Sequence, residues 1–252
     1  MLEISISPEM IEKMVRCIAD AVGDDIREDF QRSNLKTDNS FFSRIWDYLN
    51  TNLLNTLETD ACDPIVTNRG PWDMVVLYEN TSQCIFTFMR EKRFAELQRR
   101  QRNRKRMHYI DMVTRYFNSD LLADQGQMSL FPHEFSDEDR LAELVGSFLH
   151  DLSGGVDIVR RHVLVLFNTD GFQLTSVRAV MITPSLEIAK GCEEDWSKYI
   201  ANEESLIVER VENATSPMNQ PDRGLSLTAK ALSRKKDKPH RKSMDISEEK
   251  ES

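Results

Sequence analysis

Two carboxylates and two cations lie at the ends of neighbouring predicted strands, where they could share one site. Asp73 lies at the start of one strand, and Glu91 follows the end of its partner, with Lys92 and Arg93 directly after it. Two carboxylates can hold Mg²⁺ at a phosphate, while a lysine stabilises developing charge or positions the attacking water. These four residues are the candidate catalytic group, and Asp73 and Glu91 are the candidate metal ligands.

The order of elements around these residues is helix, strands, helix and strand. With an acid on one strand and an acid and a base at the end of the next, this order resembles the core of the PD-(D/E)XK nucleases, which implies Mg²⁺-dependent cleavage of nucleic acid. The chain departs from the Glu-x-Lys pattern of those enzymes, because adjacent Glu91 and Lys92 point to opposite faces of a strand and only Arg93 shares the face of Glu91. In the alternative, Glu91 pairs with arginines at a solvated junction of strand and helix.

A second candidate site is a dense run of cations. Residues 90–106 carry nine basic and two acidic side chains, a local charge of +7, so that the rest of a chain of net charge -9 carries -16. The planar guanidinium of arginine binds phosphate oxygens in pairs. The alternative is a solvated helix that pairs within the fold or with an acidic partner protein. The candidate nucleic-acid-binding residues are Arg99, Arg100, Arg102, Arg104, Lys105 and Arg106.

The remaining residues that could do chemistry favour structural roles. Residues 193–195 are three consecutive acids, which cannot converge on one point from a helix and fit a helical first turn. The four cysteines lie far apart in apolar surroundings, which predicts buried thiols rather than a zinc site. No glycine-rich phosphate loop, nucleophile elbow or dinucleotide fingerprint is present. We expect no cofactor, except Mg²⁺ if the chain is a nuclease, and whether it is an enzyme stays open.

Helical spacing of apolar residues alternates along the chain with two-residue spacing. The turn at residues 79–82 and the Asp170-Gly171 pair each join two strands into a hairpin. The predicted helices cover residues 8–30 (with a weak point at Gly23), 39–57, 94–117, 136–149 and 193–200. The predicted strands cover residues 65–67, 72–78, 84–89, 163–167 and 172–182.

These elements predict an α+β fold with a small, mostly antiparallel sheet built from two β-hairpins and flanked by helices. We expect a single folded domain over residues 1–215 and a disordered, charged tail over 216–252, where the apolar period ends. No stretch approaches the roughly 18 to 20 apolar residues of a membrane-spanning helix, and residues 1–8 lack the pattern of a signal peptide. We therefore expect a cytoplasmic protein without a membrane partner.

Three short motifs carry a further resemblance. Residues 87–94 (TFMREKRF), together with 69–72 (RGPW) and 195–200 (DWSKYI), are similar to a bacterial family that is catalogued only as a domain of unknown function. The resemblance spans roughly residues 40–200 and implies a bacterial source. Such proteins are often encoded by mobile elements, phage or defence modules.

Three functional hypotheses follow from these patterns. The first is a non-enzymatic protein that binds nucleic acid or a partner protein through the basic helix, in a mobile-element or defence module. The second is a Mg²⁺-dependent nuclease of the PD-(D/E)XK kind. The third is an adaptor that binds proteins alone.

Overall fold

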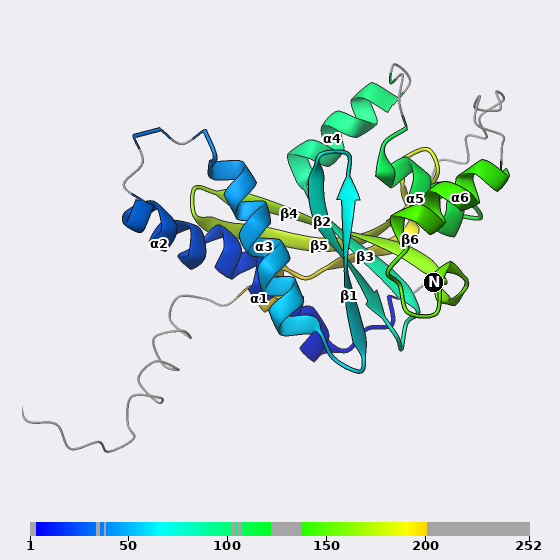
Figure 1. Ribbon diagram of the computed structural model, residues 1–252, viewed down its shortest axis with the longest axis horizontal. Coiled ribbons are helices and arrows are strands. Elements are labelled where there is room, and N and C mark those ends of the chain that lie inside the picture. The colour runs from blue at the N-terminus through cyan, green and yellow to red at the C-terminus, as the bar shows by residue number, and fades with distance from the viewer. Residues whose placement is uncertain are drawn as a thin grey trace, which may run out of the picture. The chain divides into compact units, whose positions relative to one another are not determined.

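The computed structural model describes residues 4–33, 36–37, 39–101, 104, 107–121 and 138–200 (Figure 1). The chain divides into two units, Met1–Leu206 and Ile207–Ser252. The second unit lies wholly outside the described residues, and so does the predicted tail over 216–252. The predicted domain boundary at residue 215 therefore stays a prediction.

The N-terminal part of the chain is helical, with α1 over Pro8–Val22, α2 over Asp24–Ser33 and α3 over Phe41–Leu57. The start of α1 follows the sequence signal, because the Ser7 side chain accepts a hydrogen bond from the Met10 N–H at 3.2 Å and Pro8 occupies the first turn. The predicted helix over 8–30 is divided at Gly23. A Cβ atom at Gly23 would lie 2.9 Å from the Ala19 carbonyl oxygen, so only glycine fits this junction.

The described residues form a six-stranded sheet in the order β1-β2-β3-β4-β5-β6. All neighbouring strands are antiparallel except β3 and β4, which are parallel, so the predicted α+β fold with a mostly antiparallel sheet is confirmed. Both predicted hairpins are present as β2–β3 and β4–β5, and β1 and β6 extend them. The strands are β1 (Cys62–Arg69), β2 (Trp72–Glu79), β3 (Cys84–Arg90), β4 (Arg161–Asp170), β5 (Gln173–Ile182) and β6 (Ile188–Asp195).

The acidic residues 193–195 belong to β6, and the prediction of a closing helix there is wrong. They pair in antiparallel register with residues 178–180 of β5, and a short 3-10 turn over Ser197–Tyr199 follows the strand. Pairing with β5 satisfies backbone groups that a helix of this length would leave to solvent, and this tertiary gain outweighs local preference. Trp196 lies directly after β6 and is fully buried against Phe86.

Helices cover both faces of the sheet. Helices α1 and α3 pack on one face, and α4 (Glu91–Arg100), α5 (Tyr109–Phe117) and α6 (Glu138–Phe148) pack on the other (Figure 1). Ile85 and Phe86 are adjacent in β3 but enter opposite cores, because side chains alternate along a strand. None of the helices in the described ranges has the length and apolarity that crossing a membrane requires.

The predicted continuous helix through the basic segment is also wrong, because α4 ends at Arg100 and α5 begins at Tyr109. A new helix start is built at His108. Its ring accepts a hydrogen bond from the Ile110 N–H at 3.3 Å, and the Asp111 carboxylate accepts one from the His108 N–H at 2.9 Å. This reciprocal cap satisfies backbone donors that would otherwise lack partners, and it fixes the start of α5.

Candidate functional site

Helix α4 presents a cationic face to solvent. The helix begins directly after β3, and buried Phe94 and Leu97 hold it against the sheet. At 3.6 residues per turn, all of its charged side chains except Glu91 fall within an arc of about 120° that excludes both of these residues. Four cations and one acid on this arc give a net charge of +3. We call Lys92, Arg93, Arg99 and Arg100, together with Glu96, the α4 basic face.

Most cations of the α4 basic face have no ion-pair partner among the described residues. Arg93 pairs with Glu96 at 3.0 Å, one helical turn away. Lys92, Arg99 and Arg100 are exposed, and none of them forms an ion pair with another described residue. Within the described part of the chain, one helix thus presents three exposed cations that no carboxylate neutralises.

The other residues that the sequence predicted to bind phosphates do not lie on α4. The Arg104 side chain is 17% exposed, and its Nη2 atom donates to the Asp111 carboxylate at 2.6 Å. Because that carboxylate also caps α5, Arg104 reinforces the start of this helix rather than facing solvent. Arg102, Lys105 and Arg106 lie outside the described residues.

Glu91 forms an ion pair with Arg178 of β5. Both carboxylate oxygens of Glu91 accept from the guanidinium group, one of them from Nε at 3.1 Å, and Arg178 Nη1 reaches Glu193 at 2.5 Å. The hydrogen bond with Glu91 is the largest of the influences that raise the pKa of Arg178. The ion pair considered as the alternative role of Glu91 is therefore present, and it ties the first turn of α4 to β5 and β6.

Asp73 and Glu91 lie on different sides of the sheet. Val75 and Leu77 face the core beneath α1 and α3, so Asp73 shares that side by strand alternation. Arg178 alternates with core residues of that same side, so its side chain and its partner Glu91 lie on the α4 side. Within the described ranges, no group of three or more His, Cys, Asp or Glu residues could hold a metal ion. The geometry thus gives the predicted Mg²⁺ pair no support.

The sequence did not reveal an aromatic pocket near the start of α4. Strands β2 and β3 pair only over Leu77–Glu79, and beyond this pairing a cavity of about 360 Å³ opens. Phe42 and Trp46 of α3, Trp72 of β2 and Tyr109 of α5 contribute rings to its lining. Phe42 and Trp72 are 60% and 59% exposed, which is a large exposure for apolar rings. We call this cavity the aromatic pocket.

An asparagine holds the aromatic pocket open. The Asn50 side chain of α3 accepts from the Val75 N–H at 3.1 Å and donates to the Asp73 carbonyl at 3.5 Å. These two bonds satisfy β2 backbone groups beyond the last residue that pairs with β3. The separation of the strands is therefore built into the fold, because the backbone groups that it frees have partners.

Arg90 joins the aromatic pocket to the α4 basic face. It ends β3 immediately before α4, and its Cζ atom lies 4.7 Å from the centroid of the Phe42 ring. Its Nε atom is buried and has no hydrogen-bond partner in the described part of the chain, and burial lowers the pKa of this guanidinium. Arg27 and Arg44 also stack on phenylalanine rings, but each of them has a carboxylate partner. Arg90 has none among the described residues.

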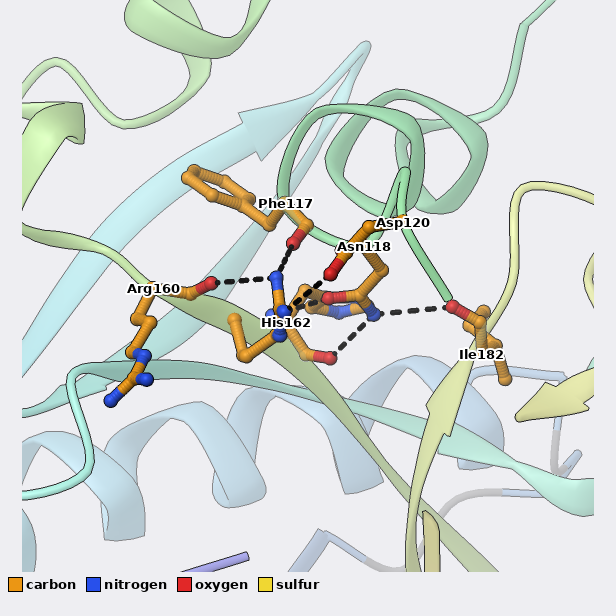
Figure 2. A network of polar contacts seen from close by, with 7 residues as sticks. Phe117, Asn118, Asp120, Arg160, His162 and Ile182 are labelled. Carbon is orange, nitrogen blue, oxygen red and sulfur yellow. Dashed lines mark hydrogen bonds and ion pairs between the residues drawn. The ribbon is translucent and has the colours of Figure 1, made fainter. Parts of the chain in front are cut away.

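A second polar network lies inside the fold and has a structural role. The Asn118 side chain donates to the carbonyls of His162 and Ile182 at 2.9 and 3.2 Å and accepts from the His162 N–H at 3.1 Å (Figure 2). The His162 ring lies between the hydroxyls of Thr87 and Thr114. Complete burial lowers the pKa of His162 to about 3, so the ring is neutral. This network fastens α5 to β4 and β5 and offers no surface to a ligand.

Comparison with known proteins gives a family for the chain. A family model described as a family of unknown function (DUF5986) matches residues 3–246. The chain belongs to this family. The resemblance read from the three motifs, to a family without assigned function, is confirmed, and the DUF5986 match extends beyond residues 40–200 in both directions. Searches of curated proteins and of solved structures found no match.

Proposed function

We propose that this member of the DUF5986 family is a non-enzymatic nucleic-acid-binding protein whose phosphate contacts are made by the α4 basic face. The observation that supports the proposal is the set of exposed cations, Lys92, Arg99 and Arg100, without partners in the described part of the chain. Following the motif resemblance, we further propose that it acts in a bacterial cytoplasm, within a mobile-element or defence module.

The charge distribution favours the approach of nucleic acid from the side of α4. The chain carries -9 overall, so most of its surface repels a polyanion. The Debye length is about 10 Å at 0.1 M salt, and a phosphate near α4 therefore interacts mainly with the local cations. Binding through this helix should release condensed counterions and depend steeply on salt.

An acidic partner protein is the main alternative, since carboxylates would also be attracted to this face. A protein partner releases no condensed counterions, so the salt dependence of its binding is shallower. The Mg²⁺-dependent nuclease remains a further alternative, although Glu91 is engaged by Arg178.

The first test compares two variants that lose the same charge. The α4 variant combines Lys92→Ala, Arg99→Ala and Arg100→Ala. The control combines Lys13→Ala, Arg16→Ala and Arg32→Ala, which removes three cations from α1 and α2, each paired with an acid one helical turn away. Binding to fluorescent single-stranded and duplex oligonucleotides is followed by anisotropy at about 50 mM salt, where phosphate contacts are strongest.

The α4 variant should bind at least about tenfold more weakly than wild type, whereas the control variant should lose less than about twofold. Equal losses in both variants would show that only net charge matters and would contradict the proposal. Incubation of wild type with Mg²⁺ and the same oligonucleotides tests the nuclease alternative. Cleavage that disappears in Asp73→Ala would replace the proposed function with that alternative.

A further inference from the structure

We propose that the aromatic pocket accepts an unstacked base of a single-stranded nucleic acid whose phosphates lie along the α4 basic face. This inference rests on the proposed function and adds to it the kind of nucleic acid and a second site. It follows from the rings that line the pocket, from the cation at its edge and from the polar groups at its rim.

The rings provide the contact for a base. Bases stack on aromatic side chains without regard to sequence, because every base has a π face. Trp72 projects from β2 and Phe42 from α3, so the exposed rings approach the cavity from different elements. At about 360 Å³ the cavity lies at the small end of the range for pockets that bind small ligands, which suits a single base rather than a base pair.

Arg90 provides the connection between base and backbone. It stacks on Phe42, has no carboxylate partner among the described residues, and lies one residue before α4. A partly buried guanidinium whose Nε atom lacks a hydrogen bond gains from an anion, so an anionic group of the ligand is its natural partner. The phosphate of a nucleotide whose base enters the pocket supplies that group, and the neighbouring phosphates continue toward Lys92.

The polar rim favours a base over a second phosphate. Asp47 and Asp73 line the pocket, both residues are exposed, and neither carboxylate bonds to another described residue. Carboxylates repel phosphate but accept hydrogen bonds from the amino and imino groups of bases. The pocket thus presents acceptors to the base, while Arg90 and α4 present cations to the backbone. A duplex cannot use this arrangement, because its bases are paired and stacked.

The test compares an intact single strand with an abasic strand of the same length, which keeps the phosphates and sugars but has no bases. Wild type should bind the intact strand about tenfold more tightly than the abasic strand. Trp72→Ala should reduce this ratio to within about twofold and leave affinity for duplex unchanged. Trp72→Phe retains a ring and should keep most of the ratio. Leu144→Ala, which removes an exposed apolar side chain of α6, is the control and should change nothing.

Quenching of tryptophan fluorescence gives a second readout, since Trp72 is exposed, Trp46 in the pocket lining is half-buried and Trp196 is fully buried. The intact strand should quench wild type more than Trp72→Phe, and the abasic strand should quench neither. Thermal melting of each variant confirms folding, and Phe42→Ala replaces Trp72→Ala if the latter does not fold. Equal binding of intact and abasic strands by wild type would overturn this inference while leaving the proposed function in place. Absence of binding to both would overturn the proposed function itself.

Discussion

His162 should make the stability of the protein depend on pH in a way that one substitution can isolate. Its ring is fully buried between the hydroxyls of Thr87 and Thr114, and burial lowers its pKa from 6.5 to about 3. In the unfolded chain the ring regains its ordinary pKa. The unfolded state therefore binds a proton that the folded state excludes, and the stability present above pH 6.5 is lost as the pH falls toward 3.

The size of the effect follows from this difference in protonation. Between about pH 7 and about pH 5, the unfolded ring is stabilised by about 2 kcal/mol through proton uptake, because each tenfold rise in proton concentration below the pKa contributes about 1.36 kcal/mol. A buried carboxylate would lower stability only at more acidic pH, because a carboxylate in the unfolded chain takes up its proton near a pKa of about 4. Over this interval His162 should therefore be the main contributor among the described buried residues.

Urea denaturation at pH 7 and pH 5 measures the effect. Wild type should lose about 2 kcal/mol more than His162→Gln over this interval, even though the variant is less stable at pH 7. His150→Gln, at a histidine whose side chain is 56% exposed, should show the pH dependence of wild type. An identical pH dependence in wild type and His162→Gln would refute the burial of a neutral ring at this position.

Three further predictions concern contacts that hold the site in place. Glu91→Gln should lower the free energy of unfolding, measured by urea denaturation, by about 1 to 2 kcal/mol because it breaks the partly buried ion pair with Arg178. Glu193→Gln, at a side chain that is 47% exposed, should lower it by less than about 1 kcal/mol, and equal losses would contradict this prediction. Asn118→Ala should lower the free energy of unfolding by about 3 kcal/mol or more, because it leaves buried backbone groups without hydrogen-bond partners. Asn80→Ala removes a hydrogen bond at the surface and should lower it by about 1 kcal/mol or less. All four cysteines should react with a thiol reagent only in denaturant, because they are buried and burial raises the pKa of each thiol; labelling of the native protein would contradict this.

The sequence predicts those parts of the fold that local signals determine. The Ser7 cap, the helical stripes of α1 and α3, and the Asp170-Gly171 turn are short-range features, and the structure has the element that each predicts. The identity of β6 depends on a partner strand, and the end of α4 depends on a cap at His108 that replaces further helical bonds. Neither dependence is visible in local periodicity.

The candidate site was only partly predictable for the same reason. The run of cations is visible in the amino-acid sequence itself. The ion pair of Arg104 with Asp111 forms only because the chain breaks between α4 and α5, and the sequence did not predict that break. Phe42 and Trp72 have the residue types and spacing of core positions. Both line the cavity beyond the short pairing of β2 with β3, and that pairing is a property of the whole sheet.

The measurement that tests the central claim most directly is the salt dependence of single-strand binding for wild type and for the variant that combines Lys92→Ala, Arg99→Ala and Arg100→Ala. Each phosphate contact to a single strand contributes about 0.7 to the slope of log affinity against log salt, so the loss of three contacts should lower the slope by about 2. A wild-type slope near zero, or a slope that the substitutions leave unchanged, would show that the α4 basic face does not bind phosphates.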